Sequence, residues 1–128
     1  VHGVDVHYLD PLTHMSCTLN TLYQIPYIIK SLADTYTNGK VMMFGGGGYN
    51  IWKVVPRAWS HVFLALIEAP PPQGQLPSQW LEKWQPYATC TLPKHWQDDK
   101  ENYIDIPREE EITATNLKHA QQVISWFK

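Results

Sequence analysis

The feature that most constrains the fold is a run of four glycines at residues 45–48, placed between the apolar segment 40–44 and Tyr49. Glycine runs adopt positive φ, allow close approach to the backbone, or form flexible linkers. A linker is disfavoured because an apolar segment precedes the run and an apolar helical pattern follows it. A phosphate loop needs Lys and Ser or Thr directly after the glycines, and Lys53 comes too late. The run therefore predicts a loop whose backbone is not covered by side chains and which is followed directly by the phenol of Tyr49.

A helical pattern precedes the glycines and begins at Leu19, with Thr18 as its expected N-cap. Asn38 and Gly39 should end this helix, and Pro26 within it should kink it. Its apolar positions follow helical spacing and are Leu22, Tyr23, Ile25, Ile28, Ile29, Leu32, Ala33 and Tyr36.

A second helical pattern follows the glycines, and Asn50 is its expected cap. Pro56 lies early in the pattern and displaces Val55 from the α region, so we expect a bent or two-part helix. The apolar stripe of this helix comprises Val55, Trp59, Val62, Phe63, Leu66 and Ile67.

Short apolar segments alternate with these two helices. Residues 1–5 resemble the end of a buried strand, and residues 40–44 read as a strand with no polar face, which is typical of the centre of a parallel sheet. Strand, helix, strand and helix within 68 residues predict an α/β layer with a parallel sheet. Ligands of such sheets bind beyond the carboxyl ends of the strands. The segments HYLDPL and GGGGYN each follow a strand, so we expect them at the same rim.

The remainder of the chain differs in composition from residues 1–68. Residues 69–78 are rich in proline, and we interpret them as a linker. We interpret residues 79–128 as a mostly helical extension. A short amphipathic helix is expected over 79–87, followed by irregular chain over 88–107. A last helix should start with Pro107 as its first residue and reach about Phe127, with glutamates in its positive first turn. Its expected buried stripe is Ile112, Leu117, Ala120, Val123, Ile124 and Phe127.

Charge and hydropathy exclude several classes of protein. A net charge of −2 and a pI of about 6.3 argue against nucleic-acid binding through a basic patch. No apolar run reaches the roughly 20 residues that a membrane span needs. Cys17 and Cys90 lack metal-type spacing, so we expect free thiols in a reducing cytoplasm. Because the chain has no initiator methionine, we expect it to be a piece of a longer protein.

Two residues near the predicted rim carry candidate chemistry. Asp10 precedes a proline at the end of a loop, where its carboxylate can bind a metal or close a turn with its own backbone. His7 is a candidate second ligand, or a loop histidine that points to solvent or to a neighbour. Tyr49 offers a neutral hydrogen-bond donor that can stabilise an oxyanion, or it is a buried tyrosine bound to a carbonyl.

The motifs taken in order resemble a known family. The order is G-x-D-x₄-D-P-L, a Thr-capped helix, an apolar strand, GGGGYN, and a helix carrying R-A-W. It resembles the C-terminal part of the catalytic core of zinc-dependent histone-deacetylase-like enzymes, which implies the arginase/deacetylase-type parallel-sheet fold. Within that family, DPLTHM, YNIWKVVPRAW and LPSQWLEKW are most similar to the bacterial acetoin utilization proteins. The resemblance covers about residues 1–68 and is looser beyond them.

The resemblance implies roles for individual residues. Asp10 matches the second aspartate ligand of the zinc, and Tyr49 matches the tyrosine that binds the acetyl carbonyl and then the oxyanion. Cys17 stands where relatives mostly have a leucine at the mouth of the substrate tunnel. The wall of that tunnel, which holds the acyl-lysine stem, matches Gly46, Gly47 and Gly48.

The resemblance also implies an activity and partners. The family hydrolyses acetyl-lysine on proteins, and the acetoin utilization proteins suggest a metabolic enzyme such as acetyl-CoA synthetase as substrate. The resemblance implies that the family's His-His pair and its zinc-binding Asp-x-His motif lie upstream of the part that this chain matches, and the chain itself has no His-His pair. We therefore expect this chain to be inactive and to hold no zinc without the missing N-terminal part, since a catalytic zinc needs three protein ligands.

Other interpretations of the chain stay open. A fragment of a parallel sheet exposes an edge, which predicts homo-oligomers. A non-catalytic interaction module of the same fold is one alternative to the enzyme. Another is an α/β domain that binds an anion or nucleotide with the glycines as a nest of backbone N–H groups.

Overall fold

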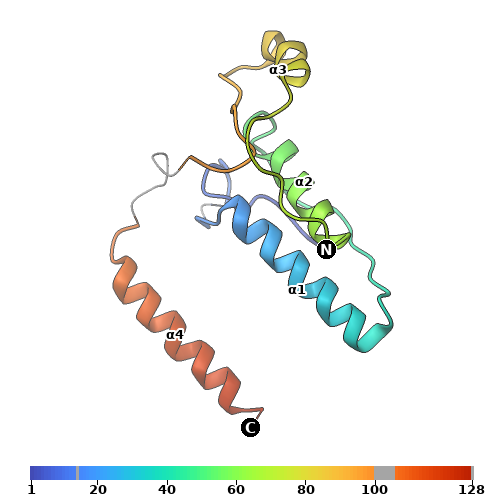
Figure 1. Cartoon of the computed structure of the whole chain (residues 1–128). Helices are drawn as coiled ribbons and strands as arrows, with labels where there is room; N and C mark the ends of the chain where they lie inside the picture. The colour runs from blue at the N-terminus through green and yellow to red at the C-terminus, as the bar shows by residue number, and fades with distance from the viewer. Residues whose placement is uncertain (14, 100–105, 128) are drawn as a thin grey trace.

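The computed structural model describes residues 1–13, 15–99 and 106–127. Parts of the DPLTHM motif and of the irregular segment expected over 88–107 lie outside the described residues. The described part contains helices and isolated β-bridges but no β-strand (Figure 1). The helices are α1 (Leu19–Thr37), α2 (Val55–Leu66), α3 (Ser78–Trp84), the 3₁₀ helix η1 (Gln85–Tyr87) and α4 (Glu109–Ser125).

Helix α1 has the ends that the sequence predicts. Thr18 Oγ1 accepts a hydrogen bond from the N–H of Thr21 at 3.4 Å, and Asn38 ends the helix in the left-handed conformation with φ of 54°. The helix runs through the buried Pro26 as one element. Both expected boundaries of this helix are therefore confirmed.

Helix α2 begins later than expected. Asn50 does not cap it; its side-chain oxygen instead accepts from the N–H of Lys53 at 3.1 Å and closes a turn before the helix. Pro56 then falls in the first helical turn, where its missing N–H has no partner to lose. The expected division of the helix is therefore wrong. Phe63 and Ile67 of the expected stripe are exposed, and Val62 is buried.

The expected parallel sheet does not form strands in the described residues. Residues 40–44 form no strand, although the N–H of His2 donates to Phe44 O at 2.9 Å beside an isolated parallel bridge between His2 and Gly45. A second parallel bridge joins His7 and Cys17. A central strand needs a hydrogen-bonded neighbour on each edge, and the described residues supply one only at these points.

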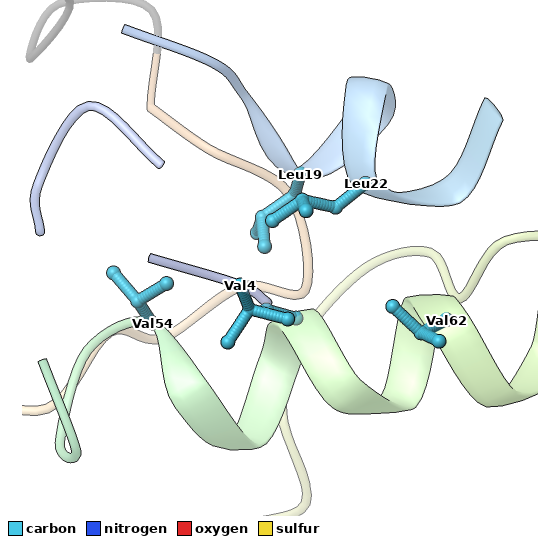
Figure 2. Close-up of a cluster of buried hydrophobic side chains, with 6 residues drawn as sticks. Val4, Leu19, Leu22, Val54 and Val62 are labelled. Carbon is cyan, nitrogen blue, oxygen red and sulfur yellow. The ribbon is translucent and has the colours of Figure 1, made fainter. Parts of the chain in front are cut away.

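A small apolar core lies between α1 and α2, which run side by side (Figure 1). Figure 2 shows Val4, from the N-terminal segment, between Leu19 of α1 and Val54, the residue before α2. Val4 therefore anchors the base of the loop that leads to Asp10. The buried cluster is Val4, Leu19, Leu22, Val54, Ala58 and Val62.

The segments on either side of α3 are joined by backbone hydrogen bonds. The N–H of Leu76 donates to Lys94 O at 2.8 Å, and the N–H of Trp96 donates to Gly74 O at 3.0 Å. Tyr23 on α1 donates its hydroxyl to Ala69 O at 2.9 Å. The chain after α2 is thus fastened to α1 and to itself.

Helix α4 forms as expected but is not packed. It starts at Glu109 rather than at Pro107, because Arg108 takes the left-handed conformation with φ of 61°. None of its residues is buried, and it packs against no other helix of the described chain (Figure 1). The expectation of a buried stripe is therefore wrong for the described residues, none of whose helices packs against α4. No helix in the described ranges combines the length and the hydropathy that crossing a bilayer requires.

Candidate functional site

The Asp10 carboxylate joins the two loops that carry the candidate chemistry. The residue is 3% exposed. Its Oδ1 accepts from the N–H of Leu12 at 2.9 Å, and its Oδ2 accepts from the N–H of Tyr49 at 2.9 Å. Asp10 therefore closes a turn and also fixes the end of the glycine run. Each carboxylate oxygen keeps a second lone-pair site, so the group retains capacity to bind a cation.

Two further hydrogen bonds hold these loops together. The N–H of Val4 donates to Gly47 O at 2.8 Å, and Asn50 Nδ2 donates to Leu9 O at 2.9 Å. The two segments expected at one rim are thus brought together. Tyr49 is 51% exposed, so the alternative of a buried tyrosine does not hold, and its phenol is accessible from solvent.

The glycines approach the N-terminal segment closely. A Cβ on Gly47 would overlap the carboxylate of Asp5, and a Cβ on Gly48 would lie 2.6 Å from Val4 Cγ2. Gly48 also has φ of 150°, which disfavours other residues. Gly46 is less crowded, since a Cβ there would lie 3.3 Å from His2 O. Packing within the chain therefore requires glycine at two of these positions, and their role in a substrate tunnel stays a prediction.

Cys17 lies beside the Asp10 loop and is partly buried. Its N–H donates to Val6 O at 3.0 Å, and its carbonyl accepts from the N–H of Tyr8 at 2.8 Å. Burial raises the pKa of the Cys17 thiol, which keeps the sulfur protonated at neutral pH. The residue contributes backbone support to the loop, and its place at a tunnel mouth stays a prediction.

His7 is buried and turned toward a distant part of the chain. Its Nε2 lies 3.1 Å from Asp98 Oδ1 and 3.2 Å from Oδ2, and its Nδ1 accepts from the N–H of Leu9 at 3.1 Å. Because Nδ1 accepts, Nε2 carries the proton that is donated to Asp98. Both ring nitrogens are therefore engaged, so His7 is the histidine bound to a neighbour rather than a metal ligand.

Asp98 is the centre of a buried polar cluster that the sequence patterns missed. Its carboxylate also accepts from the N–H of Leu19 at 2.8 Å and lies 3.5 Å from Arg57 Nη2. Burial alone would raise the pKa of Asp98, but hydrogen bonds from His7 and the Leu19 N–H, together with the charge of Arg57, hold it below its usual value. No periodic or local motif marks a contact between residues 91 positions apart.

The described residues do not make a complete zinc site. Within ranges 1–13, 15–99 and 106–127, no three His, Cys, Asp or Glu side chains gather closely enough to hold a metal. A catalytic zinc is bound by three protein ligands plus water. Asp10 offers one, so further ligands would have to come from outside the described residues.

A cavity of about 570 Å³ opens next to the Asp10 loop. Its lining includes Leu9, Lys53 and residues 91–95. Neither Asp10 nor Tyr49 is among the residues that line it. The cavity is therefore a neighbour of the candidate site and not the site itself.

Comparison with known proteins gives one family match. The histone deacetylase domain matches residues 1–66. The chain is 80% identical over all 128 residues to the acetoin utilization protein AcuC of Staphylococcus xylosus and 59% identical to that of Staphylococcus aureus strain MRSA252. It is 42% identical over 123 residues to AcuC of Bacillus subtilis strain 168. The match covers 33% of the S. xylosus and S. aureus proteins, so the chain spans about a third of their length. No solved structure matches the chain.

Proposed function

The chain belongs to the histone deacetylase family, and from this premise we propose that it supplies Asp10 and Tyr49 to the active site of a zinc-dependent protein lysine deacetylase. The observation that carries the proposal is the hydrogen bond of 2.9 Å between Asp10 Oδ2 and the N–H of Tyr49. That bond ties the buried Asp10 carboxylate to the backbone of the residue that carries an accessible phenol, which supports the proposal. Metal-assisted amide hydrolysis combines a hydrogen-bond donor that stabilises the developing charge with a metal ion that polarises the same carbonyl.

Tyr49 is the residue that we propose acts on the substrate. A phenol is neutral at pH 7, so it adds no charge to the resting site. It donates a hydrogen bond to the amide carbonyl, and that bond strengthens as the oxygen becomes anionic in the transition state. The exposure of Tyr49 supports access by a protein-bound lysine.

Asp10 is the residue that we propose as a metal ligand. Its two backbone hydrogen bonds fix the carboxylate, which leaves little reorganisation for binding a cation. Zinc, when bound, supplies Lewis-acid polarisation of the carbonyl and an acidified water. Because the described residues offer a single ligand of this set, we propose that the remaining ligands and the general base lie outside this chain, which is inactive alone.

Exposed apolar residues support the proposal that this chain packs against another part of a longer protein. Helix α1 leaves Ile25, Ile28 and Leu32 exposed, and Met42 and Phe44 are exposed in the segment after it. Apolar patches of this kind mark surfaces that other protein covers. We propose that they are covered by the part of a full-length relative that this chain lacks, with a second copy of the chain as the other possible occupant.

The substrate in this proposal is acetyl-lysine on a metabolic enzyme, such as an acetyl-CoA synthetase. The names of the relatives, acetoin utilization protein, support a metabolic setting. Cys17 and Cys90 are free thiols in the structure, which suits the cytoplasm, where we place the protein.

The test uses a chimaera in which this chain replaces the matching third of the S. xylosus protein. With an acetyl-lysine peptide, Tyr49→Phe should lower kcat about 100- to 1,000-fold, because an oxyanion donor is lost. The matched control is Tyr87→Phe, an exposed tyrosine on η1, which should leave kcat unchanged. Asp10→Ala should lower the zinc content measured by mass spectrometry. An active Tyr49→Phe enzyme would contradict the proposal, and a folded chimaera without hydrolysis would favour a non-catalytic module.

A further inference from the structure

We infer that Asp98 is a positioning residue for the Asp10–Tyr49 site, an inference that rests on the proposed function. The family match ends at residue 66, so Asp98 comes from the part of the chain beyond the matched domain. A carboxylate from outside the domain would then hold the loop that carries the proposed metal ligand.

The Asp98 carboxylate contacts three separate parts of the fold. It accepts from His7 Nε2 at 3.1 Å in the Asp10 loop and from the N–H of Leu19 at 2.8 Å at the start of α1. Arg57 Nη2 of α2 lies 3.5 Å from it. With the Asp98 side chain 2% exposed, water does not replace these partners. One buried charge therefore ties the loop to both helices.

The path from Asp98 to Tyr49 consists of consecutive hydrogen bonds. Asp98 fixes the His7 ring through Nε2, and the N–H of Leu9 donates to its Nδ1 at 3.1 Å. The N–H of Asp10 donates to His7 O at 2.9 Å. Asp10 then accepts from the N–H of Tyr49 at 2.9 Å. Rotation of the His7 ring would therefore loosen the turn that orients the Asp10 carboxylate.

The segment that carries Asp98 is itself held in place. Arg57 Nη1 donates to Gln97 O at 2.8 Å, and Arg57 Nε donates to Lys53 O at 2.7 Å. Gln97 also donates to the carbonyl of Pro72. These bonds fix the residue before Asp98 to α2 and to Pro72, which gives the loop a rigid reference point, as precise sites require.

The experiment compares Asp98→Asn with Asp99→Asn in the S. xylosus chimaera. Asp99 is the matched control, because it is the adjacent aspartate with a side chain 60% exposed. Hydrogen exchange followed by mass spectrometry reports on the loops whether or not the protein hydrolyses anything. In Asp98→Asn, we expect amides of residues 7–12 and 46–50 to exchange about tenfold faster, while the later turns of α1 exchange as before.

The kinetic arm tests the effect on catalysis. Asp98→Asn should lower kcat about 10- to 100-fold with little change in KM, as the loss of an outer partner of a site does. Asp99→Asn should change neither. If the chimaera is inactive but the two loops loosen selectively, the positioning role stands and the proposed function fails.

Two results would overturn the inference. One is an exchange pattern for Asp98→Asn that equals the pattern for Asp99→Asn. The other is an acceleration spread evenly over all helices, which indicates a general loss of stability. If Asp98→Asn does not fold, His7→Gln replaces it, since glutamine can still donate toward Asp98 but lacks the ring acceptor for the N–H of Leu9. Unchanged exchange at residues 7–12 in that variant would likewise overturn the inference.

Discussion

The α1–α2 pair and helix α4 give a direct comparison between two regions of the molecule. All three helices carry apolar residues at helical spacing, yet Leu22 and Val62 are buried between α1 and α2, whereas Leu117 and Ile124 of α4 are exposed. The first pair has Val4 and a facing helix to pack against, and α4 has neither in the described chain. Apolar spacing therefore defines which face of a helix is available for burial, and a partner surface decides whether burial occurs.

Polar residues show the same contrast. Arg57 and His61 of α2 are buried, and each has backbone partners; His61 Nδ1 lies 2.8 Å from Arg57 O. At the start of α4, Arg108, which precedes the helix, and Glu111 form an exposed pair at 3.6 Å. Buried polar groups need such partners because desolvation is otherwise unfavourable, while exposed pairs contribute little to stability.

The largest expected effect comes from removing a leucine side chain in each region. Leu22→Ala should lower the free energy of unfolding by about 2–5 kcal/mol, because Leu22 is 0% exposed and a cavity would remain. Leu117→Ala should change it by less than about 0.5 kcal/mol, since Leu117 is 58% exposed. Urea unfolding of the two variants measures both values. Equal losses would show that α4 is packed in solution.

Adding one methyl group to the glycine run should have a smaller effect. Gly47→Ala should cost about 1–3 kcal/mol, because its Cβ would overlap the Asp5 carboxylate. Gly45→Ala is the control within the same run, since its Cβ would meet Trp59 at an ordinary 3.6 Å. The melting temperatures of the two variants distinguish an effect of steric overlap at residue 47 from the general effect of replacing a glycine by alanine. Similar melting temperatures for the two would contradict the packing account.

The smallest expected effect is a change in pH dependence. Burial lowers the pKa of His61, so below about pH 6.5 the unfolded chain binds protons that the folded chain does not. Stability should therefore fall as the pH decreases from 7 to 5, and the lowered pKa of Asp98 extends the loss to lower pH. His61→Gln should flatten the first part of that decrease by less than about 1.4 kcal/mol per pH unit.

The control for this pH effect lies on α4. His119→Gln replaces an exposed histidine and should leave the slope of stability against pH unchanged. Urea midpoints at pH 7, 6 and 5 give the two slopes. If stability depends less on pH in His119→Gln than in His61→Gln, the histidine of α4 and not that of α2 would carry the pH dependence, which would contradict this prediction.

The sequence predicted that the two loops of the candidate site lie together, and the structure confirms this. Asp-Pro at residue 10 and the tyrosine after four glycines indicated two loops at one rim, and the structure brings Asp10 and Tyr49 together. The expected strands were less predictable, because a strand depends on neighbouring strands that residues 1–13, 15–99 and 106–127 do not supply. Asp98 gave no signal, since its partner His7 is 91 positions away and neither residue belongs to a periodic pattern.

By itself, the sequence determined what contacts between near neighbours control. It specified the cap of α1 at Thr18, the left-handed end at Asn38 and the helical face of α4. Only the tertiary structure decided that Asp98 holds His7, that Gly47 faces Asp5, and that the apolar face of α4 stays exposed. The reason is physical: helix ends depend on hydrogen bonds a few residues apart, whereas burial depends on surfaces from distant parts of the chain meeting with complementary shape and charge.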